Sequence, residues 1–175
     1  MAITFTALTS AAYGTDSQTY TTASVTPGSN RLVLVAVMNE PYSGTPGTVT
    51  LSGNSLTYVE IANVVYGPTA LICRNTLFRA MGASPSSGAI TITISGTGNK
   101  VCNWAVIEAD GVDTSGTNGS GAIVQSATDR TDGGDPATLT VTLSALTDAT
   151  NNAVFAAFGT DGAASVSPGT GYTEL

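Results

Sequence analysis

The sequence predicts an all-β protein, an antiparallel β-sandwich of jelly-roll type with about eleven short strands and little helix. Apolar and polar residues alternate with a period of two in segment after segment, and no helical period of 3.6 persists over three turns. Clusters of glycine, proline and asparagine separate these segments. The 175 residues also include 29 threonines and 20 glycines, a composition that favours strands and turns over helices.

The strands are predicted from the alternating segments. Ile3–Thr9 is the first such segment, and the alternation is clearest in Ala89–Ser95, where isoleucines face one side and hydroxyl side chains the other. Thr138–Leu143 repeats this pattern with leucine and valine. In chain order the predicted strands are Ile3–Thr9, Thr19–Thr26, Leu32–Met38, Thr48–Ser52, Leu56–Val65, Ala70–Arg79, Ala89–Ser95, Val101–Ala109, Ala122–Ala127, Thr138–Leu143 and Ala153–Gly159.

Two of these segments are apolar on both faces. Leu32–Met38 (LVLVAVM) and Ala153–Phe158 (AVFAAF) contain no polar face, so we expect both to be central strands that are covered on each side. The connections Pro27–Asn30, Ser52–Ser55 and Gly96–Asn99 carry residues that tolerate a positive φ and are predicted to be tight hairpin turns. Consecutive strands should therefore often be antiparallel neighbours.

The chain is expected to form a single domain, residues 1–175. Its length suits one domain of ordinary size, and neither an internal repeat nor a long linker divides it. The polar stretch Gly111–Gly121 is interpreted as a surface loop within that domain. Residues Met1–Thr9 lack the basic and continuous apolar regions of a secretory signal, so synthesis and folding in the cytoplasm are expected.

The composition argues against most enzymes and against several partners. The chain has no histidine, which removes the commonest general base, the commonest metal ligand and the Ser-His-Asp and Cys-His arrangements. We therefore expect no catalytic residues and no cofactor. The formal charge of −7, without a basic cluster, opposes nucleic acid binding. No apolar run is long enough to span a membrane, so a membrane partner is not expected either.

Three aspartates form the main metal-site candidate in the sequence, and Asp110 and Asp113 at the end of the Val101–Ala109 segment allow the same two interpretations. Asp129, Asp132 and Asp135 share a glycine-containing loop, and clustered carboxylates on such loops hold Ca²⁺. The loop lacks the spacing and the closing glutamate of an EF-hand, so the alternative is a solvated turn in which the aspartates cap backbone amides.

Other side chains allow a structural and a functional interpretation. Trp104 either packs in the core or stacks on a sugar ring. Glu60, Glu108 and Asp110 are carboxylates of the type that glycosidases use, although no dense aromatic platform accompanies them. Arg74 and Arg79 could pair with Glu60 or Glu108 across strands, or with acidic groups on a neighbouring subunit.

Cys73 and Cys102 lie in apolar strand patterns. They are interpreted as two buried thiols, with a cross-strand disulfide as the alternative.

Several segments resemble a family of tailed-bacteriophage virion-associated β-sandwich proteins. They are the Pro-Gly-Ser-Asn turn that leads into LVLVAVMN, the Leu-Phe-Arg-Ala strand end at Leu77–Ala80, the Trp-x-x-x-Glu-x-x-Gly-Val-Asp segment that starts at Trp104, and the loop Thr114–Gly119. The resemblance implies a structural role on the phage particle, as a capsid decoration or tail-associated subunit. Members of the family continue beyond the Gly-Tyr-Thr-Glu-Leu stretch, which implies an open or exchanged strand edge near the C-terminus.

The leading hypothesis is a non-enzymatic virion protein that covers or reinforces a capsid surface as a homo-oligomer, with a trimer expected. Its partners would be copies of itself and the major capsid protein or other virion subunits, and its location the virion surface. The alternative is a carbohydrate- or receptor-binding module of a phage tail or surface appendage, with a site near Trp104 or in the Asp-rich loops. A weak hydrolase that uses Glu60 or Glu108 is the third hypothesis.

Overall fold

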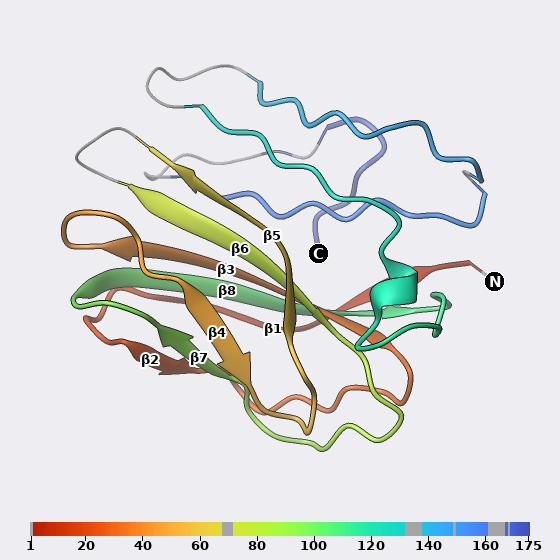
Figure 1. The fold of residues 1–175 in the computed structure, drawn as a ribbon, viewed down its shortest axis with the longest axis horizontal. Helices are drawn as coiled ribbons and strands as arrows, with labels where there is room; N and C mark the ends of the chain where they lie inside the picture. Colours follow the sequence, from red (N-terminus) through yellow and green to blue (C-terminus); the bar gives the residue numbers. More distant parts are fainter. Residues whose placement is uncertain (1, 68–71, 132–137, 149, 161–166, 168) are drawn as a thin grey trace.

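The computed structural model describes residues 2–67, 72–131, 138–148, 150–160, 167 and 169–175. These residues form two antiparallel sheets with almost no helix, as the sequence predicts (Figure 1). The described part of the chain contains eight strands and one short 3₁₀ helix: β1 (Thr4–Tyr13), β2 (Thr19–Thr21), β3 (Leu32–Pro41), β4 (Val49–Ser52), β5 (Val59–Tyr66), β6 (Cys73–Ala80), β7 (Thr91–Ile94), β8 (Asn99–Asp110) and η1 (Ser120–Ala122).

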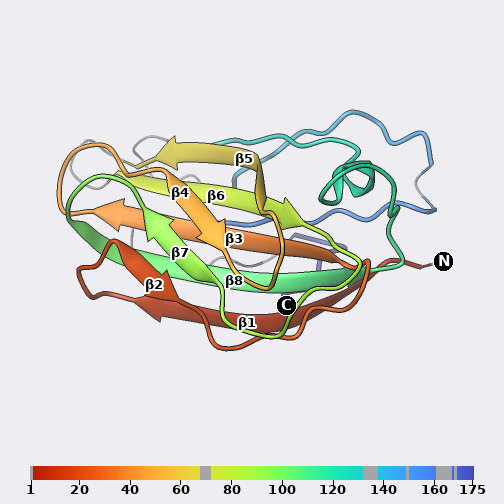
Figure 2. The same ribbon diagram turned by 60° about the horizontal axis from the view of Figure 1, so that its bottom comes forward.

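The larger sheet has the strand order β1-β8-β3-β6-β5, and the smaller sheet has the order β2-β7-β4 (Figure 2). Strand β3 is central, as its doubly apolar sequence predicts, and its register pairs Val35 with Val106 on β8 and with Phe78 on β6. All neighbouring strands run antiparallel. Residues alternate between the two faces along each strand, so β3 contributes apolar side chains to both.

The main core lies between the two sheets. The larger sheet contributes alternate residues of its central strands, including Val33, Val35 and Val37, and the smaller sheet contributes Ile92 and Ile94. All five are at most 3% exposed. Burial of this apolar surface is the main force that holds the sheets together.

A second apolar cluster covers the outer face of the larger sheet. It includes Leu34 on β3 and Ile107 on β8, against which Ile123 and Phe155 pack. The ring of Phe155 also lies 5.9 Å from that of Phe5 on β1. Figure 1 shows the chain after η1 running in extended segments along this face, so the larger sheet lies between the smaller sheet and a layer of extended chain. We call the described residues from 123 onward the outer layer.

Three strands predicted in the outer layer are not strands in the structure. Residues 122–127, 138–143 and 153–159 lie in the described part of the chain and belong to no strand there. Alternation in sequence favours an extended backbone, but a strand also requires a backbone partner at ladder distance. The segment Ala153–Phe158 was predicted to be a central strand, yet Val154 and Phe158 are exposed.

The turn predictions are correct in conformation and wrong in connectivity. Asn30, Asn54 and Ser55 adopt the left-handed region with φ values of 56°, 53° and 53°. However, Pro27–Asn30, Ser52–Ser55 and Gly96–Asn99 each connect a strand of one sheet to a strand of the other. They are therefore not hairpin turns. Among consecutive strands of the described chain, only β5 and β6 pair directly.

No helix among the described residues is long and apolar enough to cross a lipid bilayer.

Candidate functional site

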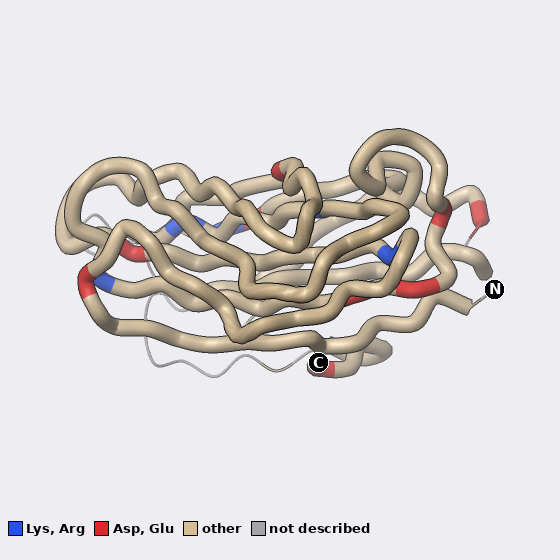
Figure 3. The backbone as a smooth tube through the Cα atoms, turned by 90° about the horizontal axis from the view of Figure 1, so that it is seen from below, with Lys and Arg blue, Asp and Glu red and all other residues tan. Residues whose placement is uncertain are grey.

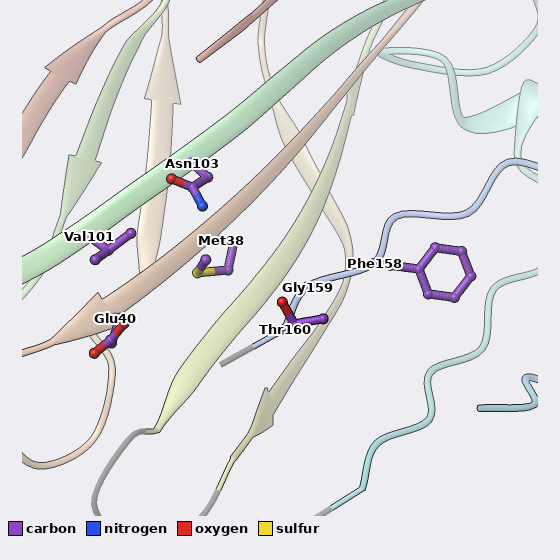
Figure 4. A pocket seen from close by; sticks show the side chains of 7 residues that line it. All are labelled: Met38, Glu40, Val101, Asn103, Phe158, Gly159 and Thr160. Carbon is purple, nitrogen blue, oxygen red and sulfur yellow. The ribbon is translucent and has the colours of Figure 1, made fainter. Parts of the chain in front are cut away.

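A shallow pocket lies where the outer layer crosses the end of β3 and the beginning of β8. Its volume is about 350 Å³, within the range of small-molecule sites. Figure 4 shows Met38 and Glu40 on β3 beside Val101 and Asn103 on β8, with Gly159 and Thr160 next to them and the ring of Phe158 set apart. The lining residues are Met38, Glu40, Val101, Asn103, Phe158, Gly159 and Thr160.

Register explains why these side chains meet. Met38 pairs with Asn103, and Glu40 pairs with Val101, so both pairs lie on the outer face of adjacent strands. The sequence at this end of β3 changes from apolar to polar, at Asn39 and Glu40. The outer face of the sheet therefore changes from an apolar surface around Leu34 to a polar one around Glu40.

The lining of the pocket includes two side chains with acceptor oxygens, Glu40 and Asn103. Lys100 Nζ lies 2.8 Å from Glu40 Oε1, and this contact with the nearly buried carboxylate raises the pKa of Lys100. Asn103 Oδ1 is buried and accepts no hydrogen bond among the described residues. An unpaired buried acceptor of this kind is unfavourable.

The outer layer is held over this region by backbone and side-chain contacts. Asn75 Nδ2 on β6 donates a hydrogen bond to the Ala157 carbonyl at 3.2 Å. The Gly159 backbone approaches so closely that a Cβ atom there would lie 2.2 Å from Tyr66 Oη. A glycine at position 159 therefore allows the chain to approach the sheet and close one side of the pocket.

The outer layer also exposes apolar side chains. Val124 is 68% exposed and Phe158 is 53% exposed. Monomeric proteins expose single apolar residues routinely, but a group of them along one extended layer is typical of an interaction surface. The large exposed apolar residues of this layer are Val124, Leu139, Val141, Val154, Phe158, Tyr172 and Leu175.

Trp104 lies in the core between the sheets and is 4% exposed. Its ring stacks on that of Tyr13, with centroids 5.0 Å apart and an interplanar angle of 9°. This position is the one expected for core packing. Trp104 does not line the pocket described above.

The calcium candidates are only partly described. Asp129 is exposed, and its Oδ1 accepts a hydrogen bond from the Arg130 N–H at 2.8 Å, as expected for a turn aspartate. Asp132 and Asp135 lie outside the described residues. No group of three potential metal ligands occurs within the described ranges. A calcium site in this loop stays a prediction.

Glu108 has a structural environment that its sequence position did not reveal. Its carboxylate is nearly buried and accepts hydrogen bonds from the Gly28 N–H at 2.5 Å and from Arg31 Nη1 at 2.7 Å. Arg31 also lies 3.2 Å from Asp110, and these two carboxylates raise the pKa of Arg31. The cluster fixes the Pro27–Asn30 turn against the end of β8.

The predicted cross-strand pairing of Arg74 and Arg79 with Glu60 or Glu108 is wrong, and the alternative, pairing with a neighbouring subunit, stays a prediction. Arg74 donates to Asn63 Oδ1, and Arg79 donates to the carbonyls of Thr117 and Asn118. Glu60 accepts from the Asn63 side chain on the same strand. Glu60 and Glu108 thus have separate partners, and neither lines the pocket.

The two cysteines are buried and form no disulfide, as the first interpretation predicts. Cys102 points into the main core, whereas Cys73 lies two strands away on β6. Burial raises the pKa of Cys102 to about 12, so its thiol is protonated at neutral pH.

Sequence analysis missed Glu40 and Asn103. Each is a polar residue within an otherwise apolar strand, LVLVAVMNE or VCNWAV, and a polar residue at such a position requires a partner. Comparison with models of known protein families, with curated proteins and with solved structures yields no match.

Proposed function

We propose that the chain is a non-enzymatic structural protein of a bacteriophage virion that covers or reinforces the capsid surface as a homo-oligomer. The observation that carries this proposal is the outer layer, an extended segment that lies on a β-sandwich and exposes large apolar side chains such as Val124 and Phe158. Such side chains gain free energy when a partner covers them, at about 25 cal/mol per Å² of apolar surface. We expect the outer layer to contact the capsid.

The strand order supports the assignment of the fold to the jelly-roll type. The orders β1-β8-β3-β6-β5 and β2-β7-β4 distribute eight strands over two sheets, which is consistent with a jelly roll, an eight-stranded fold built from two Greek keys. Viral capsid proteins and lectins both use this architecture. The fold therefore agrees with a capsid role, but it agrees equally with carbohydrate binding.

The charge distribution also supports the proposal, because it favours contacts between copies that depend on shape and apolar surface. Five basic and twelve acidic residues are spread over 175 residues, and Figure 3 shows long uncharged stretches of backbone between them. Long-range repulsion between copies is weak wherever such stretches meet, because salt screens charges beyond about 10 Å. An uncharged surface rich in threonine and serine is suited to close packing in an assembly.

Co-sedimentation with purified capsids of the phage that encodes the chain tests the proposal. The wild-type protein should co-sediment in a saturable manner, and Val124→Asp should bind at least about tenfold more weakly, which is a loss of about 1.4 kcal/mol. Thr93→Asp is the matched control, because it adds the same charge at an exposed site on β7 in the smaller sheet. Absence of wild-type binding would refute the virion role, and equal losses in both variants would refute the outer layer as the contact surface.

The pocket favours a second candidate, a carbohydrate-binding or receptor-binding module of a phage tail or surface appendage. Its lining combines polar Glu40, Asn103 and Thr160 with apolar Met38 and Phe158, a combination suited to a sugar with hydroxyl groups and an apolar face. A glycan array should then give a hit that Asn103→Ala abolishes and Thr93→Ala preserves. An array without hits, with and without calcium, would exclude this candidate.

A further inference from the structure

The two sheets have four edge strands, and β1 differs from the other three. It is ten residues long and contains neither a charged residue nor proline. Natural proteins protect sheet edges with charges, prolines, bulges, very short strands or covering segments, because an exposed edge pairs with any suitable strand. Strand β1 has one such feature, a register shift between Ala7 and Thr9, and beyond it Thr9–Tyr13 continues as a regular ladder with β8.

The other three edges are protected. In the smaller sheet β2 has three residues and β4 has four. In the larger sheet β5 carries Glu60 and a register shift beside it. Arg130 Nη1 additionally donates a hydrogen bond to the Val65 carbonyl on β5 at 2.5 Å. A charge, an irregularity and a covering side chain thus protect the edge opposite β1.

Among the described residues, the backbone of β1 has no partner on its outward side. Strand β8 is its neighbour in the sheet, and Figure 2 shows β1 along the border of the larger sheet. Within the described ranges, no hydrogen bond joins Thr4–Tyr13 to any residue outside β8. Alternate backbone N–H and C=O groups of β1 therefore point away from the sheet, in the arrangement that strand addition uses.

A second copy of β1 is the occupant that suits this edge. The exposed side chains of Thr9–Tyr13 are small or uncharged, so they offer little selectivity for a foreign sequence. Two identical edges related by a two-fold axis satisfy each other's backbone groups, since every donor on one meets an acceptor on the other. The chain carries a charge of −7, but β1 is an uncharged segment where two copies approach without direct repulsion.

We propose that two copies of the chain associate through antiparallel pairing of their β1 strands, centred on Ala11, so that the two five-stranded sheets become one continuous sheet. Ala11 is the midpoint of the regular segment Thr9–Tyr13. In this register Ser10 of one copy lies opposite Ala12 of the other, and both side chains are exposed. The inference identifies a surface for the self-association included in the proposed function, and it does not depend on the capsid.

A charge-swap series measured by sedimentation velocity tests this register. The double variant Ser10→Lys/Ala12→Lys places like charges opposite each other twice, and we expect the dimer to dissociate at least about tenfold more readily. The double variant Ser10→Lys/Ala12→Glu places opposite charges there, so it should dimerise at least as well as wild type. Thr93→Lys on β7 should leave the dimer unchanged.

Far-UV circular dichroism first establishes that each variant is folded. A wild-type monomer, a wild-type trimer, or two double variants with equal effects would each overturn β1 pairing. Capsid co-sedimentation of the Ser10→Lys/Ala12→Lys variant separates the two proposals. Dimer loss with capsid binding retained supports β1 pairing, whereas a wild-type dimer that responds to the charge swap as expected but does not bind capsids refutes the virion role alone.

Discussion

Replacement of Trp104 distinguishes the two roles considered for its side chain, packing in the core and stacking on a sugar ring. The indole is buried between the sheets, stacks on Tyr13, and lies 6.3 Å from the ring of Tyr20. Truncation of a buried tryptophan to alanine removes this packing and leaves a cavity. Such substitutions cost about 3–5 kcal/mol. We therefore expect Trp104→Ala to lower the free energy of unfolding by that amount.

Trp104→Phe should be far milder. The Trp104 Nε1–H group is buried and donates no hydrogen bond among the described residues. An unpaired buried donor costs about 1–3 kcal/mol, and phenylalanine removes it. The smaller ring loses about 1–2 kcal/mol of burial and keeps the stacking on Tyr13. The two effects nearly cancel, so the unfolding free energy should change by less than about 1 kcal/mol.

Urea denaturation followed by far-UV circular dichroism measures both variants, because each substitution removes the single tryptophan of the chain and with it the indole fluorescence. The midpoint should fall strongly for Trp104→Ala and little for Trp104→Phe, with an unchanged slope. A loss below about 1 kcal/mol for Trp104→Ala would refute the core assignment. Loss of glycan binding by a stably folded Trp104→Phe variant would favour the ligand interpretation.

Two further predictions concern polar and ionisable groups. Glu108→Gln should destabilise the protein by about 1–2 kcal/mol in thermal or urea unfolding, since the charged acceptor of the Gly28 N–H is lost while the partly exposed Arg31 adds little. Asp110→Asn, at the exposed end of the same cluster, should cost under about 0.5 kcal/mol, and equal effects would contradict this assignment. Because burial raises the pKa of Cys102 from 9.0 to about 12, the unfolded thiol ionises first as the pH rises. Stability should then fall by up to about 1.4 kcal/mol per pH unit between these values, and Cys102→Ala should lack this contribution.

Local sequence patterns predicted strands in both sheets. Doubly apolar Leu32–Met38 is central and covered on both faces, and alternation in Thr91–Ile94 gives a strand with its isoleucines in the core. Positive φ values at Asn30 and Asn54 also agree with the residue types in those turns. These features depend on short-range sterics and on the two-residue period of side chains, which a sequence shows directly.

The same patterns failed where a distant partner decides the structure. Thr138–Leu143 alternates as regularly as Thr91–Ile94, but it has no strand beside it in the described structure. The pocket combines Glu40, Asn103 and Gly159, which lie far apart in the sequence. Their proximity follows from the pairing of β3 with β8 and from the path of the outer layer.

The sequence by itself determined that this protein is built from antiparallel strands around a buried apolar core, because strand period and turn residues are local properties. Only the tertiary structure decided which turns connect the two sheets, which extended segments find strand partners, and that Arg31 rather than Arg74 or Arg79 pairs with Glu108. It alone identified β1 as the least protected edge among the described strands. Strand order fixes these outcomes, and it depends on the summed packing of residues that are distant in the chain.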